Sequence, residues 1–180
     1  MYGVDAEKWR EDLPEFREKA EAFFAGDLDK KEFKGFSGRF GSYAQRDGKG
    51  LMLRLRMTGG RVTKEKLAFV AEVIEEFHVN LVHLTTCQTI QLHNLSAEAA
   101  SKIMERALDY GIVTMGGGGD FPRNVMVSPL TGTEEEYFNV MPYAEAAGEY
   151  LMQFIHRKKL PRKLKTVFSN SPANISHATF

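Results

Sequence analysis

Residues 81–95 read LVHLTTCQTIQLHNL, a stretch in which apolar and polar side chains alternate as they do along β-strands. One face takes the apolar residues Val82, Leu84, Ile90 and Leu92. The other face carries only neutral polar groups: His83, Thr85, Cys87, Thr89, Gln91 and His93. Because a sheet face in water usually carries charged residues, this face predicts contact with a ligand. The stretch is long for one strand, so a bulge or a tight turn near Cys87–Gln88 is expected.

Two further strands are expected on either side of this stretch. Residues 51–57, LMLRLRM, alternate strictly, with leucines on one face and Arg54 and Arg56 on the other. The rise along a strand places these two arginines about 7 Å apart on the same face. Residues 123–129, RNVMVSP, form a short third strand after a run of glycines.

Two helices separate these strands. Thr63 and Ser96 are suited to cap helices expected at 64–78 and 97–110, and Gly111 suits the left-handed residue after the second helix. In the first helix, the spacing predicts one buried face made of Leu67, Val70, Ala71, Ile74 and Phe77. The order strand, helix, strand, helix, strand predicts an α+β fold, a ferredoxin-like antiparallel sheet with helices on one face.

The sequence predicts three parts along the chain. Residues 1–48 form an N-terminal helix, interrupted at Pro14, and an extended, irregular arm rich in glycine and charge. Residues 49–142 form the ferredoxin-like domain. Residues 143–180 contain a further helix and strand, which are either the start of an incomplete second α/β domain or a tail that packs on the first.

Composition excludes several classes of function. The 180 residues include 24 basic and 24 acidic side chains, so no net charge favours nucleic acid or an anionic membrane. No apolar run approaches the ~20 residues that span a bilayer, and no signal peptide is recognisable. The single cysteine indicates a reducing cytoplasm and cannot by itself hold an iron–sulfur cluster or a structural zinc. The five histidines lack the spacing of a metal site, so no metal ligands are expected.

Cationic side chains recur on the predicted strands and beside the glycine run: Arg54, Arg56, Arg123, Lys163 and Lys165. Each of these side chains, taken alone, is explained as an ordinary charge on the protein surface. The glycines at 116–119, taken alone, are explained as a flexible connector. Glycines also allow backbone N–H groups to approach an anion closely. Together with the uncharged face of 81–95, these residues predict a surface for a flat ligand with several carboxylates, or for a small oxyanion.

Four motifs carry a family resemblance: SYAQRDGKGLMLRLRMTGGRVT, LVHLTTCQTIQLHNL, GGDFPRNVMVSPLTG and LPRKLKTVFSN. In this order, from about Phe33 to Phe168, they resemble the N-terminal half of the siroheme-dependent nitrite and sulfite reductases. The resemblance implies six-electron reduction of nitrite to ammonia or of sulfite to sulfide, with electrons from ferredoxin or a flavoprotein. It implies siroheme and a [4Fe–4S] cluster in the full-length protein, with 49–142 as a reductase half-domain and 143–180 as the start of the siroheme/[4Fe–4S] domain.

The same resemblance assigns residues by their place in the motifs. It implies an anion-binding catalytic site formed by Arg56, Arg123, Lys163 and Lys165. It implies cofactor-binding positions at Arg54, Thr85, Cys87, Gln91, His93 and Asn124. The family usually has arginine where this chain has Cys87, so one expected partner of a siroheme carboxylate is replaced by a neutral thiol.

The cluster-binding cysteines of such chains lie further along, so these residues alone are expected to be inactive and to bind siroheme weakly or not at all. The sequence is then an excised fragment or a natural half-protein. The alternative function is a non-catalytic ferredoxin-like module that binds a tetrapyrrole or anion or acts in assembly. Expected partners are the oxyanion, a donor such as ferredoxin and, through an uncovered sheet edge, a second copy in a homodimer. Nucleic acid is not expected, because the strand faces lack aromatic residues for base stacking.

Overall fold

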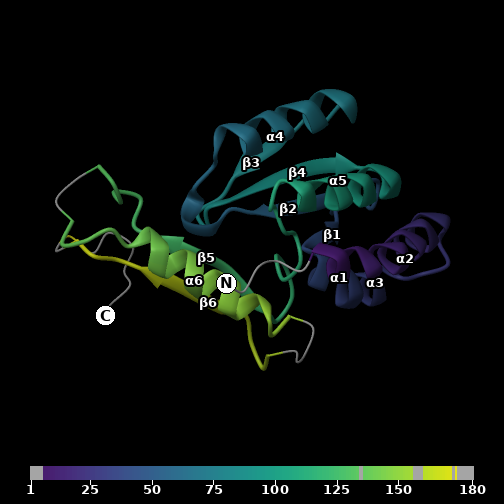
Figure 1. Cartoon of the computed structure of the whole chain (residues 1–180). Coiled ribbons are helices and arrows are strands. Elements are labelled where there is room, and N and C mark those ends of the chain that lie inside the picture. The colour runs from purple at the N-terminus through teal and green to yellow at the C-terminus, as the bar shows by residue number, and fades with distance from the viewer. Residues whose placement is uncertain (1–5, 134–135, 156–159, 172, 174–180) are drawn as a thin grey trace.

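The computed structural model describes residues 6–133, 136–155, 160–171 and 173 of the chain. Figure 1 shows two regions of unequal size. The larger region contains a four-stranded sheet with helices α1–α5, and the smaller region contains strands β5 and β6 with helix α6. The predicted α+β class with a ferredoxin-like antiparallel sheet is confirmed.

The N-terminal part is more ordered than the sequence predicted. It contains helices α1 (Ala6–Glu11), α2 (Leu13–Ala25) and α3 (Lys30–Ser37), a short 3-10 helix η1 (Gly38–Phe40) and strand β1 (Ser42–Ala44). Pro14 lies in the first turn of α2, where its missing N–H costs nothing, so the expected interruption is confirmed. The expectation of an irregular arm is wrong, because Asp29 caps α3 by accepting hydrogen bonds from two backbone N–H groups and Phe33 is fully buried.

The large sheet has the order β1-β2-β4-β3, and every neighbouring pair is antiparallel. Its other strands are β2 (Leu51–Arg56), β3 (Val82–Leu84) and β4 (Thr89–Leu95). Residues 81–95 therefore form a hairpin and not one bulged strand, and the tight turn near Cys87–Gln88 is the alternative that the structure adopts. The Gln88 N–H donates to the Thr85 carbonyl at 2.9 Å and closes this turn.

Helices α4 (Lys64–Glu76) and α5 (Ala97–Asp109) begin at the predicted caps, and Gly111 has the predicted positive φ of 62°. The buried face of α4 differs from the expected one. Phe69, Val70 and Val73 are buried, whereas Leu67 is 59% exposed. The Phe69 ring stacks on the ring of Tyr110 with centroids 4.6 Å apart, so the buried face includes Phe69 and excludes Leu67 and Ala71, while Val70, Ile74 and Phe77 pack on the core as predicted.

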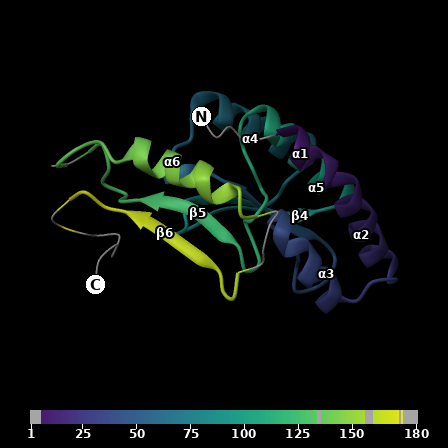
Figure 2. The same ribbon diagram turned by 60° about the horizontal axis from the view of Figure 1, so that its bottom comes forward.

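The smaller region is a strand–helix–strand unit. Strands β5 (Pro122–Val127) and β6 (Leu164–Phe168) pair in parallel, and α6 (Met141–Met152) connects them and lies along the pair (Figure 2). The strand expected at 123–129 therefore exists but does not join the four-stranded sheet. It takes its partner from the segment 143–180, and the division at residue 142 stays a prediction.

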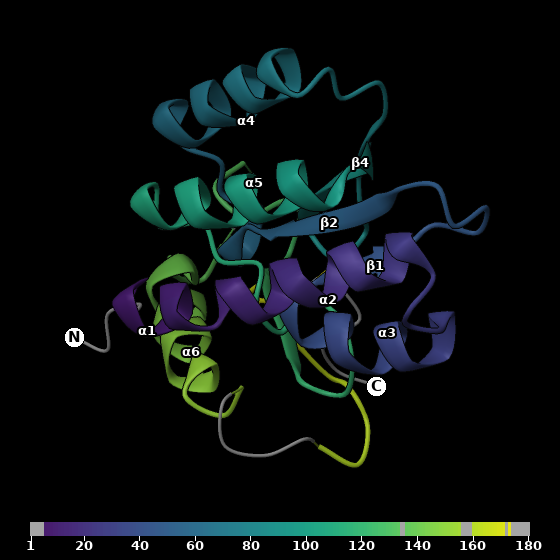
Figure 3. The same cartoon turned by 90° about the vertical axis from the view of Figure 1, so that its right-hand side faces the viewer.

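The hydrophobic core consists of two clusters, and the larger one also takes in Ile155, which follows α6. One continuous cluster joins the leucines of β2 and β4 to helices α2, α4 and α5, and Figure 3 shows α2 beside α5 on the side away from α4. The second cluster contains four buried residues of the smaller region: Val125, Val127, Val140 and Ala144. The face of β2 opposite its leucines carries Arg54 and Arg56 and is turned towards β5. This leaves the candidate site at the seam between the two regions.

Candidate anion-binding site

A pocket of about 330 Å³ lies where the arginine-bearing face of β2 and β4 meets β5 and β6. Its lining includes five cationic side chains and, among the described residues, no carboxylate. Nine of the ten site residues predicted from the sequence line it: Arg54, Arg56, Thr85, Cys87, Gln91, Arg123, Asn124, Lys163 and Lys165. The tenth, His93, lines a neighbouring groove that shares Tyr43, Arg54 and Gln91 with the pocket.

The register of the hairpin places the polar side chains predicted to share a face on one side of the sheet. Arg54 is opposite Gln91 across β2 and β4, and His83 is opposite Gln91 across β3 and β4. Residues directly opposite each other in a sheet share a face, so the turn folds the polar side chains of 81–95 back onto one surface. Thr85 and Thr89 close the hairpin with their hydroxyl oxygens 2.7 Å apart.

Arg56 is the most deeply buried cation of the pocket, with 7% of its surface exposed. Its guanidinium donates to the carbonyls of Met115 at 2.9 Å, Pro122 at 3.1 Å and Arg123 at 2.9 Å. Burial and the neighbouring charge of Arg123 lower the Arg56 pKa to about 10, which still leaves the group protonated at neutral pH. Arg56 therefore supplies positive charge to the pocket while it holds the strand β5 against β2.

Arg54 and Gln91 form a polar pair in the middle of the pocket wall. With the amide oriented to satisfy both neighbours, the Gln91 oxygen accepts from Arg54 Nε at 3.0 Å and Nη2 at 2.7 Å. The Arg54 pKa is lowered mainly by burial and, to a smaller extent, by the nearby positive charge of Arg123. A bound anion would relieve that repulsion, because it would lie between two like charges.

Arg54 and Arg123 meet at one backbone oxygen. Both guanidinium groups donate to the carbonyl of Gly117, and the Arg123 contact is 2.5 Å long. Arg123 Nε also donates to the Gly119 carbonyl at 3.3 Å. The two side chains come from different regions of the molecule, so this carbonyl holds their charged ends together at the pocket.

The glycine run is neither a flexible connector nor a cradle of free N–H groups. The N–H groups of Gly116 and Gly117 donate to the backbone carbonyls of Arg39 and Thr114, and the Gly119 N–H donates to the Tyr43 hydroxyl. The Gly117 carbonyl accepts from Arg54 and Arg123. A Cβ atom on Gly118 would lie 2.5 Å from the Tyr43 hydroxyl and 2.6 Å from the Gly38 carbonyl oxygen. Close packing against η1 and β1 therefore requires glycine here.

The remaining cations and the thiol lie at the open side of the pocket. Lys163 and Lys165 are exposed residues at the start of β6, and both line the pocket. Cys87 is half-buried at the hairpin turn and is a free thiol. Its position beside Arg54 leaves the pocket without the extra cation that an arginine would supply there.

His93 and Asn124 lie at opposite ends of the site. His93 Nδ1 is 3.3 Å from the Gln45 amide nitrogen, and burial, His83 and Arg54 lower the His93 pKa, in that order of size. The His83 and His93 rings are 6.3 Å apart between centroids, because the hairpin brings them onto the same face. Asn124 is 2% exposed and donates only to backbone carbonyls, which makes it part of the pocket frame.

Sequence reasoning missed several lining residues. Tyr43 lies on β1, in the segment expected to be irregular, so no strand pattern identified it. Gly117 contributes a carbonyl oxygen, which no residue type signals. Gln88, at the expected turn, does not line this pocket: its backbone is left-handed, with a φ of 53°, and its side chain bonds to Val127 on β5 instead.

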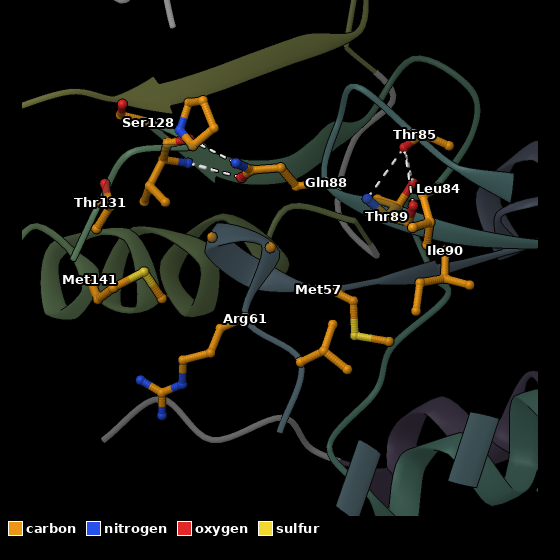
Figure 4. Close-up of a pocket in the computed structure, with 15 residues that line it drawn as sticks. Met57, Arg61, Leu84, Thr85, Gln88, Thr89, Ile90, Ser128, Thr131 and Met141 are labelled. Atoms are coloured by element: carbon orange, nitrogen blue, oxygen red, sulfur yellow. Dashed lines mark hydrogen bonds between the residues drawn. The ribbon is translucent and has the colours of Figure 1, made fainter. Parts of the chain in front are cut away.

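A second, mostly apolar pocket of about 500 Å³ lies on the other side of the hairpin turn (Figure 4). Met57, Leu84, Ile90 and Met141 point towards it, and Arg61 lies at its edge. Thr85 and Thr89 line both pockets, so the turn separates the cationic pocket from an open apolar space at the seam. The seam between the two regions is therefore not closed by apolar packing at this point.

Comparison with known proteins agrees with this arrangement. Residues 43–110 match the nitrite/sulfite reductase ferredoxin-like half domain, and residues 118–180 match the nitrite and sulphite reductase 4Fe-4S domain. A sulfite reductase [ferredoxin] of Mycobacterium tuberculosis is 28% identical, with 85% of this chain and 32% of the relative covered. An assimilatory ferredoxin-dependent nitrite reductase of Haloferax mediterranei is 30% identical, with 87% of this chain and 30% of the relative covered.

Among solved structures, the Mycobacterium tuberculosis NirA protein matches with a TM-score of 0.67 at 23% identity, over 97% of this chain and 36% of that one. This likeness supports the fold. The chain spans about a third of the length of the relatives it matches. With both domain families in the expected order, the chain belongs to the siroheme-dependent nitrite/sulfite reductase family.

Proposed function

We propose that the chain is the N-terminal part of a siroheme-containing reductase that converts nitrite to ammonia or sulfite to sulfide, and that the cationic pocket binds the oxyanion. The observation that carries this proposal is a pocket with five cationic side chains and no carboxylate among its described lining residues. In a chain with equal numbers of acidic and basic residues, such a concentration of one charge favours a small anionic ligand.

The residues present fit one wall of a siroheme site. The pocket and its neighbouring groove form a continuous polar face along β2 and β4, where Arg54, Gln91 and His93 would meet the carboxylate-bearing edge of the macrocycle. When bound, siroheme would supply the iron that holds the oxyanion and passes electrons to it.

The chain's own cations have separate tasks in this proposal. Arg123 holds positive charge in a fixed place beside the oxyanion, because its guanidinium donates to the Gly117 carbonyl. Lys163 and Lys165 carry mobile ammonium groups that can donate protons to oxygen atoms of the substrate as they leave. Arg56 stabilises the same negative charge through its own positive charge, while its N–H groups remain hydrogen-bonded to the backbone carbonyls of Met115 and Arg123.

The [4Fe–4S] cluster does not fit these residues, because Cys87 is the only cysteine of the sequence. No step of the proposal therefore uses a cluster bound here. The names of the two relatives support ferredoxin as the electron donor of the full-length protein. In the described part of the chain, none of the helices has the length and apolar character needed to cross a membrane. A cytoplasmic location remains part of the proposal, on the basis of the single unpaired cysteine.

Calorimetric titration of the chain with sulfite, nitrite and sulfate tests the anion site. Arg123→Gln and Lys163→Gln are each expected to weaken sulfite binding about tenfold, as loss of a charge-assisted hydrogen bond predicts. Lys102→Gln is the matched control, because it removes one positive charge on α5, outside the pocket. Equal affinities for wild type, Arg123→Gln and Lys102→Gln would contradict the proposed site. Reduction of nitrite or sulfite by the full-length protein, measured with a chemical electron donor, tests the reaction itself.

A specific observation also favours self-association. Strand β3 is one of the two edge strands of the large sheet, and Val82 and Leu84 on it are 37% and 76% exposed. An exposed apolar edge pairs readily with an identical edge around a two-fold axis. We propose that a second copy of the chain covers β3 in solution.

Sedimentation equilibrium of the wild-type chain is expected to give a dimer mass at high concentration. Leu84→Lys places a charge on the edge and should yield a monomer, whereas Leu67→Lys on the exposed face of α4 should leave the dimer intact. A monomeric wild type, or a dimer insensitive to Leu84→Lys, would rule out this interface without affecting the oxyanion proposal.

A further inference from the structure

Gln88 makes two hydrogen bonds across the seam. Its side-chain Nε2 donates to the Val127 carbonyl at 2.7 Å, and its Oε1 accepts from the Val127 N–H at 3.0 Å. Figure 4 shows both bonds as dashed lines from the Gln88 amide to the neighbouring strand. The amide thus pairs with Val127 as the backbone of an adjacent strand would, and it ties the hairpin turn to the end of β5.

Asn124 makes the reciprocal connection. From β5, its Nδ2 lies within hydrogen-bond distance of the carbonyls of Met57 at 2.8 Å, Cys87 at 3.0 Å and Gln88 at 3.0 Å. Gln88 and Asn124, which we call the amide clamp, therefore reach in opposite directions between the hairpin turn and β5. Both side chains bond to backbone atoms, so the clamp sets the spacing of the two chain segments and does not depend on further side chains.

The clamp lies beside the open apolar pocket at the seam. The open apolar pocket separates Met57 and Ile90 of the larger region from Val127 and Met141 of the smaller one. Arg123 directly precedes Asn124 in β5, at the place where the pairing of β5 with β6 shifts register between Pro122 and Val125. The position of Arg123 relative to Arg54 therefore depends on how the turn and β5 are joined.

We propose that Gln88 is a positioning residue for oxyanion binding: by pairing with Val127 it holds Arg123 at the separation from Arg54 at which both guanidinium groups reach one ligand. The meeting of these two groups at the Gly117 carbonyl is the geometry that the clamp preserves. This inference rests on the proposed oxyanion site. Preorganised donors bind an anion more tightly than the same donors on a mobile strand, because less conformational entropy is lost on binding.

A double-mutant cycle on sulfate binding separates positioning from simple stability. Sulfate stays a dianion across the usable pH range, so its charge does not vary during the titration. Gln88→Met keeps the side-chain length and removes both amide bonds, and it is expected to weaken sulfate binding about fivefold to tenfold. In an Arg123→Gln background the same substitution should change the affinity less than twofold, because the group that Gln88 positions is already absent.

Two further variants complete the test. Gln88→Leu also removes both amide bonds and adds no charge, so it should weaken sulfate binding as Gln88→Met does. Asn80→Ala removes an amide hydrogen bond to Asn94 at the far end of the same hairpin and should leave sulfate affinity unchanged. If Gln88→Met does not fold, as judged by circular dichroism, the cycle is run with Gln88→Leu.

The outcomes distinguish this inference from the proposed function. If Arg123→Gln leaves sulfate binding unchanged, the oxyanion site itself is wrong. If Arg123→Gln weakens binding but Gln88→Met does not, only the positioning role is overturned. Equal losses from Gln88→Met in both backgrounds would also overturn it, because an effect independent of Arg123 indicates a general loss of structure.

Discussion

The two regions of the molecule differ in how they are held together. The larger region has one continuous core that includes the fully buried rings of Phe16, Phe33 and Phe40. Among the residues that the structure describes, the cluster of the smaller region has four buried members, none of them aromatic. The seam between them combines polar contacts from Arg56, Gln88 and Asn124 with an open apolar pocket, and Ile155 of the smaller region packs into the larger cluster.

This difference bears on the candidate site, because its cations come from both regions. Arg54 and Arg56 stand on a strand in the middle of a well-packed sheet, whereas Arg123, Lys163 and Lys165 stand on the two-stranded unit. Groups on a rigid scaffold keep their geometry, and groups on a weakly packed unit need separate contacts to hold them. The polar contacts at the seam perform that task. Changes to the two cores and to the seam test this comparison.

The largest expected effect comes from the core of the larger region. Phe40→Ala removes a ring that packs on Phe16 and Phe36, each with centroids 5.1 Å away, and should lower the free energy of unfolding by about 3–5 kcal/mol. Val125→Ala in the small core should cost about 1–2 kcal/mol, because fewer apolar contacts are lost. Urea unfolding measures both. Equal costs would show that the two cores are not as different as their sizes indicate.

The next effect is expected at the seam. Arg56→Met leaves the carbonyls of Met115, Pro122 and Arg123 without their buried donor, which should cost about 2–4 kcal/mol. The control is Arg17→Met, which breaks an exposed ion pair with Glu21 on α2 and should leave the unfolding midpoint nearly unchanged. If the two variants unfold alike, Arg56 does not hold the regions together.

A smaller effect is expected at the glycine run. Gly118→Ala places a methyl group against the Tyr43 hydroxyl and the Gly38 carbonyl and should destabilise the fold by about 1–3 kcal/mol. Gly35→Ala meets no atom within 4 Å on helix α3 and should stabilise the protein by about 0.5–1 kcal/mol. Thermal unfolding of the pair gives the comparison, and the same sign of change in both would show that packing does not require glycine at Gly118.

The smallest effect is a pH dependence at His93. Its pKa is lowered by burial, by His83 and by Arg54, so the folded state binds its proton less readily than the unfolded state. Stability is therefore full above the ordinary histidine pKa and falls as the pH drops through the lowered value. Between pH 7.5 and 5.5, the fall in melting temperature should be about 1–2 °C smaller for His93→Gln than for wild type. An equal or larger fall in His93→Gln would assign the pH dependence to another group.

Local sequence rules located most of the elements. Thr63 and Ser96 cap the helices that were expected after them, and Pro14 begins α2. Alternation placed Arg54 and Arg56 on one strand face, and the family motifs identified nine of the residues that line the pocket. Side-chain spacing along a chain is enough for these conclusions, because caps and strand faces depend on near neighbours.

Other features depend on contacts between distant segments. Phe33 and Phe40 lie among glycine and charged residues, so α3 and β1 became visible only through their packing on α2 and β2. The choice of a hairpin for 81–95 follows from the pairing of β3 with β4. The predicted buried face of α4 was wrong for Leu67, because Phe69 packs on Tyr110, the residue that follows α5.

The sequence by itself determined the family, the strand that carries the arginines, the helix caps and the residue types of an anion site, since each is written in local patterns and motif order. Only the tertiary structure decided that β5 pairs with β6, that the glycine run offers carbonyls to the arginines, and that Gln88 ties the hairpin turn to β5. Apart from Arg123 and Gly117, which are 6 positions apart, these arrangements join residues 30 or more positions apart, such as Gln88 and Val127, which are 39 apart. Local propensity carries no information about such pairs, because their energy comes from hydrogen bonds and packing that exist only after the chain has folded.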